Sequence, residues 1–205
     1  MASCVVITAV ICVLITAVAT IVAFATPNWL KFRYSDLDNQ LQPLCSAPDV
    51  GDFCYNCDCG LWLRCHGEIT TSGQLDNCRW FFADDFQIEQ RLPDWFKAVQ
   101  GLMAVAVASS LLALLIGLFS LCCYCKSCNP HQAAGAFINL TFLLLAVAVC
   151  VFGAKAHLDV DAEVLAEPNS TNPLFDWSFW VAVGAGGMAL ISSIMYFCVG
   201  RQDEI

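Results

Sequence analysis

Four long runs without a charged residue constrain this chain more than any other feature of its sequence. Residues 1–30, 98–125, 127–154 and 177–200 contain no Lys, Arg, Asp or Glu, so the 9 basic and 18 acidic residues all lie elsewhere. A helix that crosses a bilayer needs about 20 mostly apolar residues, whereas a membrane barrel shows short alternating segments. The runs therefore predict four transmembrane helices, at about residues 5–26, 98–121, 133–154 and 177–199.

These spans exclude a soluble enzyme, a nucleic-acid-binding domain and a disordered chain. The formal net charge of −9 also opposes nucleic acid, which requires a basic surface. No charge lies within a span to mark a transport pathway, and no nucleophile with a base and an orienting group is recognisable. We expect no catalysis, no metal site and no cofactor.

The first run is interpreted as a retained span and not as a cleaved signal peptide. Residues 1–3 carry no side-chain positive charge, and the apolar stretch of 22 residues exceeds the usual 7–15. Small residues four apart, as in Ala113-x-x-x-Gly117 and Ala185-x-x-x-Ala189, predict close packing of the spans within one bundle.

The four spans place both termini on one side of the membrane and loops 27–97 and 155–176 on the other. Six cysteines lie in the long loop, an even number that is typical of disulfides in an oxidising space. Asn169 begins an Asn-Ser-Thr glycosylation sequon in the short loop. We therefore expect a multi-pass plasma-membrane glycoprotein, with both loops extracellular and both termini cytoplasmic.

This topology assigns a cytoplasmic loop to residues 122–132 and a cytoplasmic tail to residues 200–205, within a single domain of residues 1–205. The charges then divide unevenly. The long loop carries a net charge of −5, the short loop −4, and the cytoplasmic segments zero. The predicted extracellular surface is therefore acidic.

The long loop also predicts a small sheet. Residues 29–34, 60–65 and 78–82 are strand-like runs, and the last two carry Cys65 and Cys78, so an antiparallel pair joined by a Cys65–Cys78 disulfide is the simplest arrangement. Residues 84–94 are predicted to form a short amphipathic connection to the second span. The pairing of the other four cysteines stays open: Cys45, Cys54, Cys57 and Cys59.

The pattern of Trp29, Gly60-Leu61-Trp62-x-x-Cys65 and Cys78 between the first two of four spans resembles the W…GLW…C…C signature of the claudin superfamily. This superfamily includes epithelial membrane proteins, peripheral myelin proteins and channel gamma subunits. The resemblance implies a membrane α-helical fold: a four-transmembrane-helix bundle with a small extracellular antiparallel β-sheet. The chain departs from the usual pattern in its four additional loop cysteines, its longer Cys65–Cys78 spacing and its short tail.

Two functions follow from the resemblance. The first is a protein of cell–cell junctions that forms or regulates a paracellular barrier by association with itself or related four-span proteins, in cis and in trans. Glu68 and Asp76 would then be candidates for charge selection, and residues 173–175 for a contact tip. The second is an auxiliary, gamma-type subunit of an ion channel or receptor. Membrane lipid is a partner in both.

Two further motifs lie on the cytoplasmic side. Juxtamembrane cysteines are usual sites of S-palmitoylation, which would make the protein a lipoprotein; a zinc site is the disfavoured alternative, because adjacent cysteines seldom bind one tetrahedral ion. The terminal acid and hydrophobe suit the groove of a PDZ scaffold. The acylation candidates are Cys122, Cys123, Cys125 and Cys128, and the terminal motif is Asp203, Glu204 and Ile205.

Overall fold

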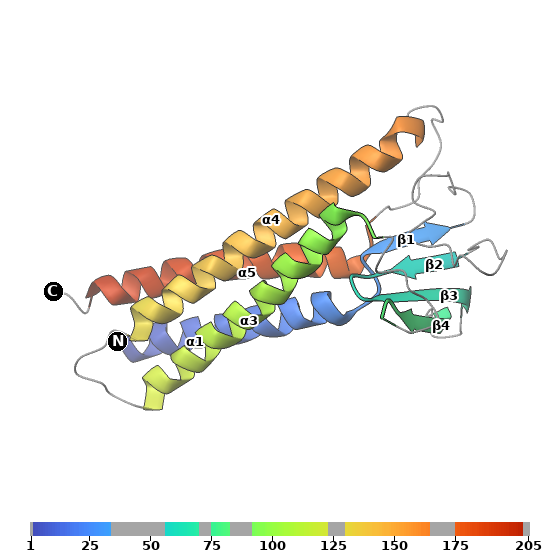
Figure 1. Ribbon diagram of the computed structural model, residues 1–205. Helices are drawn as coiled ribbons and strands as arrows, with labels where there is room; N and C mark the ends of the chain where they lie inside the picture. Colours follow the sequence, from blue (N-terminus) through green and yellow to red (C-terminus); the bar gives the residue numbers. More distant parts are fainter. Residues whose placement is uncertain are drawn as a thin grey trace. The chain divides into compact units, whose positions relative to one another are not determined.

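Figure 1 shows the computed structural model with its helices and strands labelled. The chain divides into two compact units. We call Met1–Val22, Gly101–Ala148 and Val181–Ile205 the helical unit, and Ala23–Gln100 with Val149–Trp180 the sheet unit. The expectation of a single domain over residues 1–205 stays a prediction. The structure describes residues 2–33, 56–69, 75–82, 92–122, 130–164 and 175–202.

The four predicted spans are confirmed as helices. These are α1 (Ala2–Ala25), α3 (Asp94–Cys122), α4 (Pro130–Val164) and α5 (Trp177–Gln202). Each contains a stretch long and apolar enough to cross a membrane, namely Cys4–Ala25, Asp94–Leu121, Pro130–Ala156 and Trp177–Val199. Together with the four-stranded sheet described below, they confirm the predicted membrane α-helical architecture.

Two helix boundaries differ from the sequence prediction by four residues or more. α4 continues to Val164, through residues predicted to be loop, because residues 155–164 contain no Gly or Pro and include Ala, Leu and Glu. α3 begins at Asp94, four residues before the predicted span. The carbonyl of Pro93 accepts hydrogen bonds from the backbone N–H groups of Phe96 and Lys97, which starts that helix before the apolar run begins.

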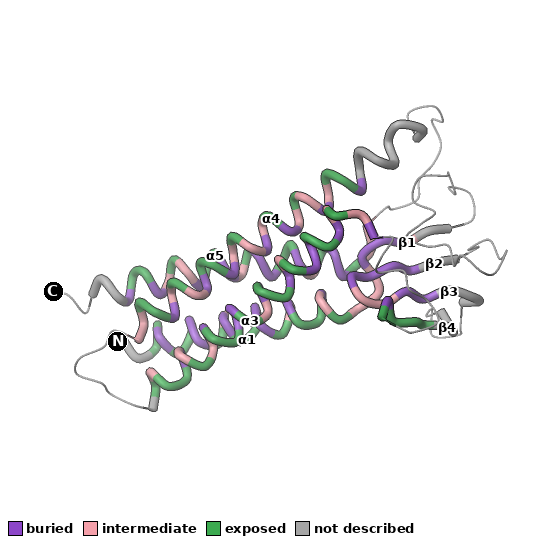
Figure 2. Tube along the Cα trace, in the orientation of Figure 1, coloured by how far each residue is buried: buried purple, intermediate pink, exposed green. Residues whose placement is uncertain are grey.

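The helical unit packs through small residues. Ala113, Gly117, Ala185 and Ala189 are buried, as the small-residue spacing predicts. Large aliphatic side chains of the same helices are exposed, and Figure 2 shows buried and exposed residues alternating along these helices. This arrangement suits a bundle in lipid, where close backbone approach and not hydrophobic burial brings helices together.

A hydrogen bond joins two spans inside the helical unit. The hydroxyls of Ser109 on α3 and Thr141 on α4 lie 2.8 Å apart, and both residues are buried. Thr141 is the third residue of an Asn-Leu-Thr sequon. Its role in helix packing and its place within a span explain why we expect no glycan there.

The sheet unit holds four strands, β1 (Leu30–Arg33), β2 (Asn56–Cys59), β3 (Leu63–Ile69) and β4 (Leu75–Trp80), in the order β1-β2-β3-β4. All neighbouring strands are antiparallel. Leu30 pairs with Cys59, and Cys65 pairs with Cys78. The predicted antiparallel sheet is thereby confirmed, with one more strand than the sequence indicated.

The strand boundaries shift from the predicted ones for two physical reasons. Residues 60–62 form the turn from β2 to β3 instead of the start of a strand, since the N–H of Gly60 donates to the carbonyl of Leu63 across 2.9 Å. Phe81 and Phe82 follow β4 in a turn, because Phe81 is buried against α3. β2 was not predicted, and its Asn-Cys-Asp-Cys sequence lacks the usual strand formers.

Candidate functional site

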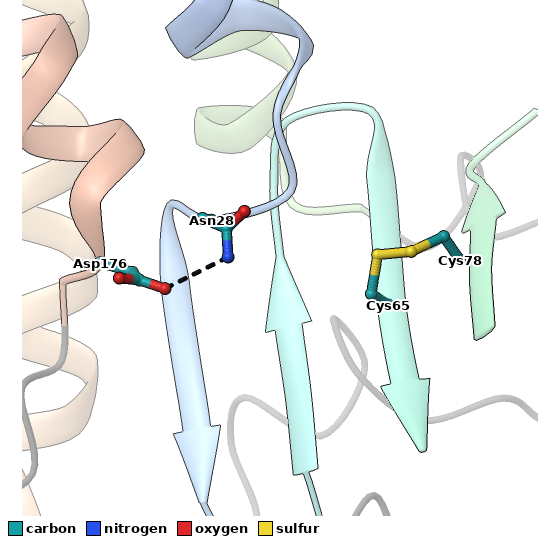
Figure 3. The surroundings of a disulfide bond; sticks show 4 residues. All are labelled: Asn28, Cys65, Cys78 and Asp176. Carbon is teal, nitrogen blue, oxygen red and sulfur yellow. Dashed lines mark hydrogen bonds between the residues drawn. A yellow bond between two sulfur atoms is a disulfide. The ribbon is translucent and has the colours of Figure 1, made fainter. Parts of the chain in front are cut away.

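The Cys65–Cys78 disulfide joins β3 to β4 within the sheet (Figure 3). The two cysteines face each other directly in the register, with their Cα atoms 4.0 Å apart. This confirms the pairing that the sequence predicted. A cross-link over a loop of this size stabilises the folded state by about 3 kcal/mol, mainly by restricting the unfolded chain.

Trp29 connects the sheet to the helices of its own unit. Its side chain is completely buried, and its indole N–H donates to the carbonyl of Ala23 across 2.6 Å. The ring meets Phe152 of α4 at 4.8 Å and Phe179 of α5 at 6.0 Å between ring centroids, both edge to face. A buried tryptophan with a satisfied N–H and favourable ring geometry fixes the start of β1 against both helix ends.

Gly60 and Leu61 bring the turn between β2 and β3 against the end of α1 and the start of α3. A methyl group on Gly60 would overlap the carbonyl of Thr26 and lie 2.5 Å from the Cα of Pro27, so only glycine fits. Leu61 is fully buried, and its carbonyl accepts a hydrogen bond from the side chain of Gln100. The signature residues therefore dock the sheet onto the spans of the sheet unit.

Asp176 links the short loop to the first strand. One carboxylate oxygen accepts a hydrogen bond from the N–H of Trp177 at 2.8 Å, which caps α5. The other accepts one from Asn28 at 3.3 Å (Figure 3) and lies 3.9 Å from Nζ of Lys31. The backbone N–H groups of Asp176 and Ser178 also donate to the carbonyls of Trp29 and Asn28, each at 3.1 Å.

The second-loop segment does not present Phe175 as a contact tip. Phe175 is half-buried, forms a β-bridge with Leu30 and stacks on Phe179 at 4.3 Å between ring centroids. The bridge therefore pairs this residue with the first residue of β1, at the edge of the sheet. Residues 173 and 174 lie outside the described part of the chain.

Glu68 and Asp76, the two charge-selection candidates, lie on the neighbouring strands β3 and β4. The register between these strands shifts between His66 and Ile69. Glu68 therefore sits in an irregular segment of the sheet. Their role in charge selection stays a prediction.

Three further candidate cysteines lie within the described residues. Cys57 and Cys59 lie on β2, where Cys59 is buried and its thiol donates to the carbonyl of Gly60 at 3.8 Å. Cys122 is the last residue of α3. The remaining candidates lie outside the described residues, so they stay predictions: Cys45, Cys54, Cys123, Cys125, Cys128, Asn169, Asp203, Glu204 and Ile205.

The site includes residues that the sequence analysis did not single out. Phe152, Phe179 and Asp176 supply the helix side of the contacts to Trp29 and Asn28. Phe152 sits inside an apolar span, where an aromatic residue gives no signal of its own. Asp176 alone gave a signal in the sequence. It is the last acidic residue before the fourth span, where an acidic residue commonly caps the start of a helix.

Within the residues that the structure describes, no three His, Cys, Asp or Glu side chains gather as metal ligands would. What this geometry offers is a surface: a cross-linked sheet held rigidly on helix ends.

A family model for the PMP-22/EMP/MP20/claudin tight junction proteins matches residues 13–198. A search of curated proteins found no significant match.

Proposed function

The chain belongs to the PMP-22/EMP/MP20/claudin family, and from this premise we propose that it is a non-enzymatic plasma-membrane protein of cell–cell contacts. In this proposal, copies of the chain associate through the sheet unit, laterally within one membrane and across to the neighbouring cell. The association forms or regulates a paracellular barrier.

One observation carries the proposal: the sheet is fixed twice, by a disulfide within it and by Trp29 beneath it. A recognition surface loses less conformational entropy on binding when it is ordered beforehand. The bonds from Asp176 to Asn28 and Trp177 extend the same order to the second loop. A simple connection between two spans would need none of these contacts.

The proposed orientation places the sheet unit outside the cell and both termini in the cytoplasm. The Cys65–Cys78 disulfide supports it, because disulfides persist in oxidising compartments and are rare in the cytosol. Glycosylation at Asn169 would agree with the same orientation. Its test is a mobility shift on glycosidase treatment that Asn169→Gln abolishes.

A mixed culture tests the contact role. Fibroblasts that form no tight junctions would express the fluorescently tagged chain and be mixed with non-expressing cells. We expect enrichment at contacts between two expressing cells and none at contacts with a non-expressing cell. Equal signal at both kinds of contact, from a chain that reaches the surface, would overturn the trans association.

The acidic residues of β3 and β4 would bias what passes between cells. Glu68 and Asp76 lie on adjacent strands, and a pore lined by such carboxylates favours cations. Glu68→Gln should lower the cation-over-anion permeability ratio of an epithelial layer that expresses the chain, measured by dilution potentials. An unchanged ratio for both Glu68→Gln and Asp76→Asn would remove them as selectivity residues.

The alternative function is an auxiliary subunit of an ion channel or receptor. The observation that favours it is the additional pair of cysteines on β2, Cys57 and Cys59, beyond the signature disulfide. Affinity purification in mild detergent followed by mass spectrometry separates the two functions. A stoichiometric channel would support the alternative, whereas only copies of this chain or related four-span proteins would support the junctional role.

Two cytoplasmic interactions belong to the same proposal. Acylation of the cysteines that begin at Cys122 would hold the loop after α3 at the inner leaflet. The terminal residues Asp203, Glu204 and Ile205 would add as a strand to a PDZ scaffold. Metabolic labelling with an alkyne-palmitate, and pulldown by PDZ domains with and without Ile205, test them separately.

A further inference from the structure

The sheet unit exposes four large hydrophobic side chains among its described residues, and all four are aromatic. They are Trp80 at 56% exposure, Phe82 at 53%, Trp177 at 44% and Trp180 at 60%. Trp177 and Trp180 lie in the first turn of α5, where the span Trp177–Val199 begins. Tryptophan gathers at membrane–water interfaces, because its ring is apolar and its N–H is polar.

Trp80 and Phe82 are fixed at the same end of the spans by the residue between them. Phe81 is buried, and its backbone N–H donates to the carbonyl of Trp62 at 3.0 Å. Its ring lies 6.2 Å from that of Phe96, which belongs to the span Asp94–Leu121. Since Phe96 is the third residue of that span, the end of β4 sits level with the start of a membrane helix.

A row of ring contacts connects Phe82 to the span Cys4–Ala25. Phe24, the penultimate residue of the span Cys4–Ala25, meets Trp62 edge to face at 5.2 Å. Trp62 in turn stacks on Phe82, with 5.6 Å between ring centroids and 25° between planes. Phe24 and Trp62 are half-buried. The exposed ring of Phe82 is therefore connected through Trp62 to Phe24 at the end of α1.

We propose that Trp80 and Phe82, which we call the β4 aromatic patch, lie in the headgroup region of the lipid bilayer. The partner is a phospholipid surface, reached by the continuous row Phe24, Trp62 and Phe82. The β4 end of the sheet is thus anchored in the membrane interface. This proposal concerns one copy of the chain in its own membrane, so it stands apart from the proposed cell-contact function.

Fluorine NMR tests the position of the patch. The full chain would carry 5-fluorotryptophan and be placed, one copy per nanodisc, in phosphatidylcholine. The Trp80 resonance is assigned by Trp80→Phe, which keeps an aromatic ring at that position. Two relaxation agents are compared: a phosphatidylcholine with a nitroxide on its headgroup, and a water-soluble gadolinium chelate.

The measured quantity is the broadening of a resonance by the lipid nitroxide divided by its broadening by the aqueous chelate. Two other tryptophans of the chain serve as references for this ratio. Trp177 marks the start of a span, and Trp29 is fully buried. We expect the ratio for Trp80 to equal or exceed that for Trp177. A lower ratio would overturn the proposal and place the patch in water. Protection from both agents, like that of Trp29, would also overturn it, because protein and not lipid would cover the patch.

Discussion

The helical unit and the sheet unit differ in which kinds of side chain they bury. In the helical unit, buried positions are rich in alanine, such as Ala113 and Ala189, and large aliphatic residues such as Ile11 and Leu115 are exposed. In the sheet unit, large aromatic residues such as Trp29 and Phe81 are buried. The comparison indicates that the two units of this chain are suited to different surroundings, lipid for the helical unit and water for the sheet.

The physical reason is the medium that surrounds each unit. Lipid tails are as apolar as leucine, so burying leucine within a bundle gains little and small residues allow close packing instead. In water, burying a large aromatic side chain is strongly favourable. We therefore expect substitutions of single large residues to damage the sheet unit more than the helical unit.

The largest effect is expected for Trp29→Ala. Truncation of a buried tryptophan costs about 3–5 kcal/mol, and here it also removes the N–H bond to Ala23. Faster hydrogen exchange in residues 56–69 would report the loss. Trp180→Ala is the matched control, because its ring is exposed. Equal effects of the two substitutions would contradict the distinction between buried and exposed aromatics.

Loss of the disulfide comes next. Cys65→Ser or Cys78→Ser should destabilise the sheet unit by about 2–5 kcal/mol and retain the chain in the secretory pathway. Surface biotinylation measures the delivered fraction. Cys150→Ser is the control, because Cys150 is an exposed free cysteine on α4. Normal delivery of both disulfide variants would show that the sheet does not depend on this bond.

A methyl group at Gly60 should have a smaller effect. Gly60→Ala forces backbone away from Pro27 and Thr26, at a cost of about 1–3 kcal/mol. A lower midpoint of thermal unfolding in detergent would show it. Gly184→Ala is the control in the helical unit, since nothing lies within 4 Å of its added methyl group. If both variants melt alike, the turn is not closely packed.

The smallest effect belongs to the helical unit. Ser109→Ala and Thr141→Val each remove the hydroxyl pair between α3 and α4. Hydrogen bonds between membrane helices contribute about 0.6 kcal/mol on average. A double-mutant cycle in a denaturing-detergent titration isolates this interaction from the packing changes. A coupling free energy as large as the destabilisation by Trp29→Ala would contradict the proposed difference between the two units.

The sequence predicted the elements of the helical unit better than those of the sheet unit. A span is a local property of length and charge, visible without any partner. The sheet depends on partners that are distant in the chain: β2 forms between β1 and β3 in spite of its composition. Likewise, Trp29 was recognised from its signature, but Phe152 and Phe179 could be assigned to it only through the fold.

The central claim is that the sheet unit is an ordered surface whose stability depends on its disulfide, whereas the helical unit is stabilised by the packing of its spans in lipid. Hydrogen exchange with mass spectrometry, on the wild-type chain in nanodiscs before and after reduction, tests it directly. We predict much faster exchange in residues 56–69 and 75–82 after reduction, and no change in residues 101–122. Equal acceleration in both regions, or none in the strands, would contradict the claim.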